Sequence, residues 1–243
     1  MAGSDLLAPS THDAIFGGRV TLHQPARGHG YRVNADSLLL ADFAGSAKRG
    51  TVFDLGAGVG SIALVLFARG LASRAVLVDD DGVSCALAER NVAVNGVNAT
   101  VVYGDVLDVA NERRGQASLV VCNPPYFAPT AVRPSKARGT RARVGDLDRF
   151  VRAARAVLGR RGRACFIYPS SDVVRLFASL RAAGLEPKRL RLVHPSAKAP
   201  ARAAMVEASA SKPGGLITLP PLLERGGPRH GDYTREVARA LGL

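Results

Sequence analysis

A glycine-rich turn is the first stretch of this sequence whose residue types could bind a ligand. The segment "DLGAGVG" (54–60) follows an apolar run and precedes the apolar, helix-like "SIALVLFARG". Glycines at alternate positions let the backbone turn tightly and approach a ligand at the start of a helix, where free N–H groups point outward. NAD-binding proteins also have glycine-rich turns, but this spacing is not G-x-G-x-x-G, and an acid precedes the glycines. The candidate ligand-binding residues of the turn are Asp54, Gly56, Gly58 and Gly60.

Acidic residues also end the next two strand-like runs. The run "RAVLVDD" (74–80) ends in Asp79 and Asp80, where a carboxylate would receive ribose hydroxyls. The run "ATVVYGD" (99–105) ends in Asp105, placed to accept from an adenine amine. Each acid alone has a structural alternative, since Asp81 could cap a helix and Asp105 could start a turn. Together, at successive strand ends, they predict a nucleoside cofactor across the carboxyl edge of a sheet, with Asp79 and Asp80 both open as the ribose ligand.

Short apolar runs alternate with helical patterns along the chain, which predicts βαβ units and a parallel sheet covered on both faces. Near the C-terminal end, "PKRLRLVHP" (187–195) and "ARAAMVEASA" (201–210) are separated by a short loop containing proline and predict an antiparallel edge pair. The predicted fold is therefore α/β and Rossmann-like, with a mostly parallel seven-stranded sheet, an antiparallel edge and helices on both faces.

The length of 243 residues suits a single structural domain. We expect residues 1–50 to form an N-terminal extension packed on the core, and residues 51–243 to form the main domain. Within the extension, "RVTLHQP" (19–25) predicts a strand and "ADSLLLADFAG" (35–45) a short helix.

No apolar run approaches the roughly 20 residues of a membrane span, and no basic segment leads into an apolar one near the start. These features favour a cytoplasmic protein. The three cysteines are far apart, show no metal-ligand spacing and are expected to be buried, reduced thiols.

The formal net charge of +13 indicates a polyanion as partner, nucleic acid first and acidic membrane second. Arginine supplies most of the positive charge. Because GC-rich coding alone can increase the number of arginines, it is an alternative explanation of the high charge. The distribution favours a partner, because two basic tracts contain no acid. The basic residues of the first tract (127–145) are Arg133, Lys136, Arg138, Arg141 and Arg143. Those of the second tract (187–206) are Lys188, Arg189, Arg191, Lys198 and Arg202.

A double proline follows the fourth strand-like run, in "VVCNPPYFAP" (120–129). Each proline removes a backbone donor and fixes φ, and Pro124 also restricts Asn123 to an extended conformation. Pro-Pro alone could be no more than a rigid loop. Because this elbow ends a strand at the same edge as the glycine turn, we expect Asn123 and Tyr126 to face the cofactor.

In this order, the turn, the acids and the Asn-Pro-Pro-Tyr tetrapeptide resemble the class I S-adenosylmethionine-dependent methyltransferases. The resemblance spans residues 54–126 and implies the class I methyltransferase fold, S-adenosylmethionine as cofactor and no metal. It assigns cofactor contacts to the turn residues, to the strand-end acids Asp79, Asp80 and Asp105, and to Asn123. The tetrapeptide is similar to that of enzymes that methylate a planar nitrogen, on adenine or on glutamine.

Further segments resemble the bacterial tRNA adenine-N6 methyltransferase family, which acts on the adenosine beside the anticodon of a valine tRNA. They are "HQPARGHGYRVNADSLLLADFA" (23–44), "NPPYF" (123–127) and "DYTREV" (232–237), so the resemblance covers most of the chain. Within the first segment, Asp36 either touches the cofactor or caps the helix that follows. The chain departs from the family at Asp80, where an apolar residue is expected, and at Gly145, where an acid is expected.

The resemblance implies a mechanism in which Asn123, Pro124 and Tyr126 are catalytic. An exocyclic amine is a poor nucleophile because its lone pair is delocalised into the ring. The side-chain oxygen of Asn123 and the backbone carbonyl of Pro124 would accept its two N–H bonds and favour a pyramidal nitrogen, held rigidly by the prolines. Tyr126 would stack on the extruded base. The remaining candidate substrate contacts are Phe127, Arg138, Arg141 and Arg143.

The implied substrate is therefore adenine N6 in RNA, most simply a tRNA near its anticodon. Protein-glutamine N5 methylation uses the same tetrapeptide, but such enzymes usually carry a separate helical N-terminal domain. Methylation of adenine in rRNA or DNA also stays open. A non-enzymatic RNA-binding module would be expected to lose the glycines or Asn123, which are intact. The oligomeric state is not indicated.

Overall fold

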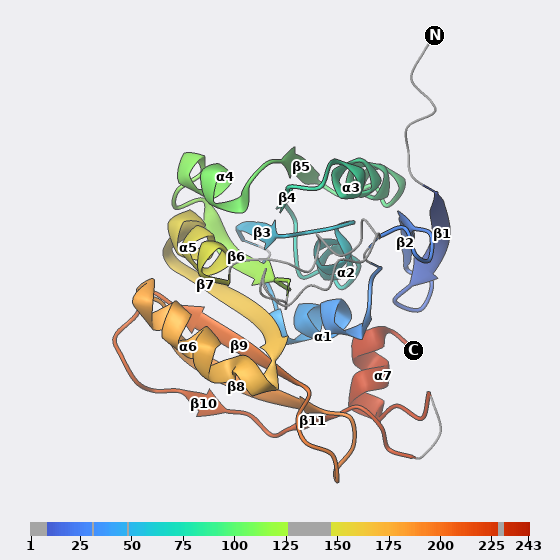
Figure 1. The fold of residues 1–243 in the computed structure, drawn as a ribbon. Helices are drawn as coiled ribbons and strands as arrows, with labels where there is room; N and C mark the ends of the chain where they lie inside the picture. The colour runs from blue at the N-terminus through green and yellow to red at the C-terminus, as the bar shows by residue number, and fades with distance from the viewer. Residues whose placement is uncertain (1–8, 31, 48, 126–146, 228–230) are drawn as a thin grey trace.

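The structure, a computed structural model, describes residues 9–30, 32–47, 49–125, 147–227 and 231–243. It is built around one large sheet with helices on both faces and a separate two-stranded hairpin beside it (Figure 1). Within the described residues, no helix combines the length and the apolar character needed to cross a membrane.

The large sheet has the order β10-β8-β9-β7-β6-β3-β4-β5, with β11 also paired to β8. The strands β3 to β7 are parallel, and β9 runs antiparallel to both β7 and β8. The predicted α/β class and antiparallel pair are confirmed. The sheet has nine strands because two-residue strands β10 and β11 add to β8, beyond the seven predicted. The strands are β3 (Thr51–Leu55), β4 (Ala75–Asp79), β5 (Ala99–Tyr103), β6 (Ala117–Cys122), β7 (Leu158–Pro169), β8 (Glu186–His194), β9 (Ala203–Ser209), β10 (Ile217–Thr218) and β11 (Leu222–Leu223).

The helices form two layers, each with its own apolar core. On one face, α1, α2, α3 and α7 pack on one set of alternating strand residues, such as Val52 and Val121. On the other face, α4, α5 and α6 pack on the intervening set, such as Phe53 and Val120. This alternation follows from the two-residue period of a strand. The helices are α1 (Ala35–Ala44), α2 (Ser61–Ala68), α3 (Gly82–Val94), α4 (Val106–Glu112), α5 (Leu147–Val157), α6 (Val173–Ala182), preceded by a 3₁₀ turn (Ser170–Asp172), and α7 (Arg235–Leu241).

The described residues between 9 and 50 contribute to the core on one face of the sheet. They contain a hairpin of β1 (Ser10–Ile15) and β2 (Val20–Pro25), followed by α1. Phe16, Val20 and Leu22 are buried in the same apolar cluster as α2 and α3. The hairpin stands beside these helices in Figure 1. The sequence predicts β2 and α1 but not the partner strand β1, because polar residues interrupt the apolar pattern of β1.

The three cysteines are Cys85 on α3, Cys122 on β6 and Cys165 on β7. All three are free and buried, as predicted. Burial raises the pKa of each thiol, and for Cys122 the neighbouring carboxylate of Asp54 raises it further. None of these thiols is therefore activated as a nucleophile.

Candidate cofactor and substrate site

The glycine turn connects β3 to α2 at the carboxyl edge of the sheet. Gly56, Gly58 and Gly60 all have positive φ, in the left-handed region that favours glycine. The backbone N–H groups of Gly56 and Ala57 donate to the Val78 carbonyl of β4, at 2.9 and 3.0 Å. The turn is thus tied to the neighbouring strand while it leads into the helix.

The space beside each glycine shows what the turn must accommodate. A Cβ on Gly56 would lie 2.9 Å from the ring of Phe150, and one on Gly60 would lie 2.6 Å from Leu77. A Cβ on Gly58 would meet no described atom within 4 Å. Gly56 and Gly60 thus lie in close protein packing, whereas no atom of the described residues lies close to Gly58. The described part of the chain therefore leaves room at Gly58 for a ligand that approaches the backbone closely.

Asp54 is fully buried near the end of β3, two residues before Gly56 of the turn. Its Oδ2 accepts a 3.3 Å hydrogen bond from the N–H of Ala63 in α2, while Oδ1 has no partner among the described residues. Burial raises the pKa of Asp54 to about 7, and repulsion from Asp79 adds to the shift. A buried carboxylate oxygen without a partner is costly, so this position is suited to a ligand that brings a donor or a positive charge.

Asp79 ends β4 and holds the turn in place. Its Oδ2 accepts from the N–H of Gly58 at 2.7 Å, and its Oδ1 accepts from the N–H of Asp81 at 3.0 Å. Burial raises the pKa of Asp79, against the effect of these two hydrogen bonds. Asp80 is exposed, and Asp81 caps α3 by accepting from Ser84 at 2.9 Å. Of the two candidate ribose ligands, only Asp79 contacts the glycine turn.

Asp105 occupies the corresponding position after β5. Its Oδ1 accepts from the N–H groups of Leu107 and Asp108 and so caps α4. Its Oδ2 pairs with Arg149 of α5 at 2.5 Å. Both oxygens therefore have protein partners, and the contact with the adenine amine stays a prediction.

The elbow lies beside the glycine turn. In the register of β3 and β6, Leu55 is opposite Cys122, so Asn123 follows β6 next to the point where the turn begins. Asn123 is half-buried and Pro124 is buried. The candidate residues Tyr126, Phe127, Arg138, Arg141 and Arg143 lie outside the described residues, as does Gly145.

One of the two roles expected for Asp36 was to cap α1, and Asp36 does not have this role. Asn34 is the cap, and its side chain accepts from the N–H of Asp36 at 3.0 Å. The buried Asp36 carboxylate instead pairs with Arg202 at 2.7 Å, and Arg202 also binds Glu224. The capping interpretation was wrong because α1 begins at Ala35, before Asp36, so that Asn34 holds the capping position.

Asn91 of α3 and Asn95, the residue directly after that helix, attach the N-terminal hairpin to the site. The fully buried Asn91 accepts from the N–H of His23 at 2.6 Å and donates to the His23 and Val59 carbonyls at 2.9 and 3.0 Å. Asn95 binds the N–H and the carbonyl of Thr21 in the same way. Because Val59 belongs to the glycine turn, Asn91 links that turn to β2. The four-residue spacing of the two amides was the available sequence signal.

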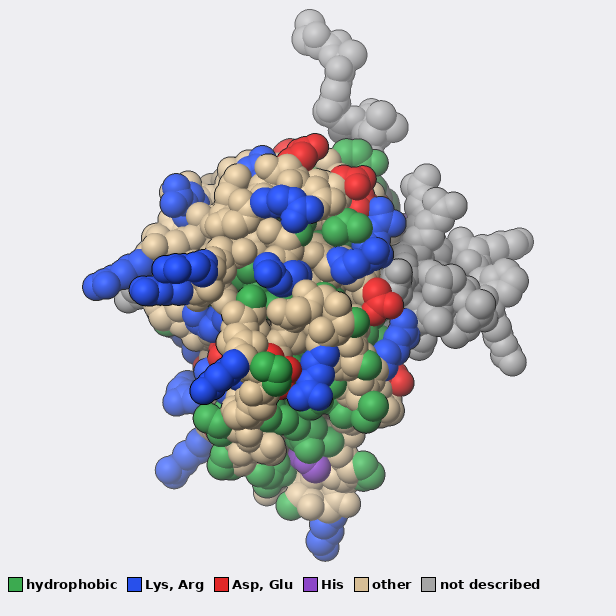
Figure 2. All heavy atoms as spheres, turned by 90° about the vertical axis from the view of Figure 1, so that its left-hand side faces the viewer, with side chains coloured by type: hydrophobic (Ala, Val, Ile, Leu, Met, Phe, Trp, Pro, Cys, Tyr) green, Lys and Arg blue, Asp and Glu red, His purple; other side chains and the backbone are tan. Residues whose placement is uncertain are grey.

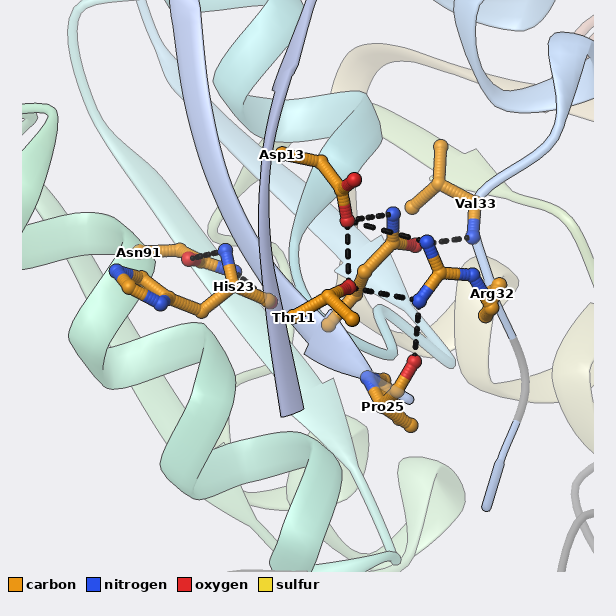
Figure 3. Close-up of polar contacts among 8 residues, drawn as sticks. Thr11, Asp13, His23, Pro25, Arg32, Val33 and Asn91 are labelled. Atoms are coloured by element: carbon orange, nitrogen blue, oxygen red, sulfur yellow. Dashed lines mark hydrogen bonds and ion pairs between the residues drawn. The ribbon is translucent and has the colours of Figure 1, made fainter. Parts of the chain in front are cut away.

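A second network fixes the segment that leads from the hairpin to α1 (Figure 3). Arg32 pairs with Asp13 at 3.1 Å and also donates to Thr11 at 2.8 Å, and Gln24 donates to Asp13 at 2.9 Å. The side-chain oxygen of Gln24 accepts from the N–H of Val33. The hydrogen bonds that Asp13 accepts from Thr11, Gln24 and Arg32 lower the pKa of its carboxyl, so the network is stable at neutral pH.

The basic tract at 187–206 is held largely by internal partners. Arg189 pairs with Glu207, Arg191 with Glu236, and Arg202 with Asp36 and Glu224. Lys188 donates to the carbonyls of Lys212 and Gly214. Most of the charges in this tract therefore have partners within the fold, because acids and carbonyls from other segments reach them.

Solved structures of other proteins share this fold. A predicted O-methyltransferase from Agrobacterium tumefaciens aligns with a TM-score of 0.66 at 23% identity and covers 84% of this chain and 94% of that one. The 16S rRNA N2 methyltransferase of T. thermophilus, solved with AdoMet and guanosine, aligns with a TM-score of 0.60 at 20% identity and covers 86% and 52%. The fold is that of a class I methyltransferase.

The sequence comparisons identify the family. The family model described as "Methyltransferase small domain" matches residues 30–171, and this chain belongs to that family. Two relatives are named tRNA1(Val) (adenine(37)-N6)-methyltransferase. The one from Parabacteroides distasonis is 30% identical over 187 residues, 74% of this chain and 77% of its own. The one from Shewanella halifaxensis is 28% identical, with coverage of 68% and 67%. The protein is a methyltransferase with S-adenosylmethionine as its cofactor, as predicted.

Proposed function

We propose that this protein transfers a methyl group from S-adenosylmethionine to the exocyclic amine of an adenine in RNA, and that its substrate is a tRNA near the anticodon. The observation that carries this proposal is the position of Asn123 and Pro124 directly after β6, beside the glycine turn. The names of the relatives, which are about 30% identical, support the same substrate.

The cofactor side of the proposal rests on three features of the carboxyl edge. The open space beside Gly58 takes the close approach of the cofactor, and Asp79 accepts the ribose hydroxyls. The unpartnered Oδ1 of Asp54 lies where a cationic or N–H-bearing part of the cofactor would compensate it. The bound cofactor supplies an electrophilic methyl group on a sulfonium.

The substrate side rests on the chemistry of an aromatic amine. The Asn123 side chain and the Pro124 carbonyl accept its two N–H bonds and increase the reactivity of the nitrogen lone pair. After transfer, the nitrogen carries the positive charge and loses a proton to water, so no strong protein base is needed. Tyr126 stacks on the base, and Arg138, Arg141 and Arg143 bind the adjoining phosphates.

A direct test incubates the protein with labelled S-adenosylmethionine and, separately, unmodified tRNA, rRNA, DNA and a release factor. The expected result is label in tRNA, recovered as N6-methyladenosine on nucleoside analysis, with transfer by Asn123→Ala slower by at least about 100-fold. Label in adenine of rRNA or DNA would support the proposed adenine methylation but show that the substrate is not tRNA. Label in the release factor would replace adenine with glutamine and overturn the proposal.

A further inference from the structure

Exposed arginines gather at the amino edge of the large sheet, opposite to the glycine turn. Arg74 immediately precedes β4, Arg49 precedes β3 by two residues, and Arg114 precedes β6 by three. Arg160 and Arg161 lie in the irregular first part of β7, where the register with β6 shifts. All five are exposed, and none forms an ion pair with a described acid. We call them the amino-edge arginines: Arg49, Arg74, Arg114, Arg160 and Arg161.

These arginines lie close together because their strands are neighbours. The strands β4, β3, β6 and β7 are consecutive in the sheet, so at about 4.8 Å per strand they span roughly 15 Å. The loop before β6 is bonded to the end of α5 through the Gly115 N–H and the Ala156 carbonyl at 3.2 Å. Figure 2 shows Lys and Arg side chains projecting together at its left-hand margin, while the acidic side chains in that view lie mostly toward the right.

Tight backbone packing holds the arginine-bearing segments in place. A Cβ on Gly162 would lie 2.8 Å from the Ala117 carbonyl oxygen, and one on Gly159 would lie 3.0 Å from that of Gly115. A Cβ on Gly50 would overlap the Ser118 hydroxyl. These glycines let the backbone lie against the start of β6, so the neighbouring arginines are presented from a fixed base.

The local acids do not neutralise the cluster. Glu207 pairs with Arg163 and Arg189, and Glu186 pairs with Arg181. Glu112, the last residue of α4, is exposed and lies two residues before Arg114 in the sequence. Five arginines and one acid close in sequence give this edge of the sheet a positive charge.

We infer that the amino-edge arginines are a second docking surface for the phosphate backbone of the RNA substrate, an inference that rests on the proposed function. Guanidinium groups suit phosphate because they donate two parallel hydrogen bonds. No large apolar residue directly adjoins any of the five in the sequence, where the neighbours are mostly small or polar, such as Gly50, Ser73 and Gly115, and this does not favour insertion into a bilayer. A strand of six residues is about 20 Å long, so one large folded RNA can reach both edges while a short stem-loop fills only one.

The test compares two double variants of the full chain. Arg160→Gln with Arg161→Gln removes two amino-edge charges, and Arg90→Gln with Arg175→Gln removes two exposed charges from α3 and α6 as a matched control. Each is measured for binding to full-length tRNA and to a short stem-loop with the target adenine, over a range of salt. Thermal unfolding of all variants checks that the fold is retained.

The amino-edge variant is expected to bind full-length tRNA about tenfold more weakly, with a log–log salt slope shallower by roughly 1.4 to 1.8 when two phosphates are no longer bound. Its binding to the stem-loop, and the control's binding to either RNA, should stay near wild type. Equal tRNA affinity in the two double variants would overturn the inference. Loss of binding to anionic phosphatidylserine vesicles with tRNA binding intact would also overturn it and assign the surface to membrane. If wild-type protein methylates no RNA, the proposed function itself fails, which the amino-edge variants do not test.

Discussion

At the carboxyl edge of the sheet, β3 carries Asp54 near its end, β4 ends in Asp79, and β5 is followed by Asp105, whereas exposed arginines lie at the amino edge of the same sheet. The parallel arrangement favours this separation. Helices begin at the carboxyl edge and end at the amino edge, and their dipoles stabilise acids at their first turn and cations at their last. Asp54, Asp81 and Asp105 all accept from N–H groups in the first turn of a helix.

The two edges differ in what the charges contact. Asp54, Asp79 and Asp105 accept from backbone donors, and among the described residues the one buried side-chain oxygen without a partner is the Oδ1 of Asp54. The amino-edge arginines are exposed and form no ion pair with a described acid. The carboxyl edge is thus organised for a small ligand at fixed positions, and the amino edge offers only charge, which suits a large polyanion.

The largest effect is expected at the carboxyl edge, from Asn123→Ala. The methylation rate should fall at least about 100-fold, because one preorganised acceptor for the reacting amine is removed, while cofactor affinity stays nearly constant. Single-turnover methylation of tRNA, with calorimetric titration of S-adenosylmethionine, separates the two quantities. Thr218→Ala, on the exposed strand β10, is the control. A near wild-type rate for Asn123→Ala would exclude the nitrogen-activation mechanism.

Replacing the strand-end acid of β4 should weaken cofactor binding. Asp79→Ala is expected to cost roughly 1.5–3 kcal/mol of binding free energy, because charge-assisted hydrogen bonds to the ribose are removed. Asp80→Ala should cost less, since Asp80 is exposed and makes no contact with the turn. Calorimetry on both variants gives the order, and the reverse order would assign the ribose to Asp80.

The buried acid of β3 should make stability depend on pH. Asp54 has a pKa of about 7 in the folded protein and an ordinary value of 3.8, so the folded state holds a proton that the unfolded state releases. The free energy of unfolding should therefore fall as pH rises from about 4 to about 7, by up to about 4 kcal/mol for this group.

Asp54→Asn retains the shape of the side chain and removes this titration. The stability of the variant relative to wild type should thus increase from about pH 4 to about pH 7 in urea unfolding experiments. Saturating S-adenosylmethionine should reduce the difference if the cofactor compensates Oδ1. A constant difference across this range would mean that Asp54 ionises at its ordinary pKa.

The smallest expected effect concerns the basic tract that follows the elbow. Changing Arg138, Arg141 and Arg143 to Ala should make the salt slope of RNA binding shallower by about 0.7 for each single-strand phosphate that the protein no longer binds. Cofactor affinity should not change. Unlike the amino-edge pair, this triple variant should weaken binding to the short stem-loop as well as to full-length tRNA, because the tract adjoins the reacting base. If the triple variant and the amino-edge double variant weaken binding to tRNA and to the stem-loop equally, the two edges do not bind different parts of the RNA.

The amino-acid sequence by itself determined the fold class, the glycine turn and the position of the elbow. Each of these is a local pattern: apolar runs of strand length, glycines at positions of positive φ, and prolines that end a strand. Because parallel strands bring their carboxyl ends to one edge, the order of these patterns was enough to place Asp54, Asp79 and Asn123 together.

Only the tertiary structure decided which charged and polar side chains have a partner within the protein. Arg202 binds Asp36 and Glu224, and Arg191 binds Glu236, across separations that no local pattern encodes. The same holds for Asn91, whose amide contacts β2 and the glycine turn from the buried face of α3. Charge and polarity can be counted along the chain, but whether a group has a partner depends on which segments the folded core brings within hydrogen-bonding distance, because these interactions act over a few ångströms.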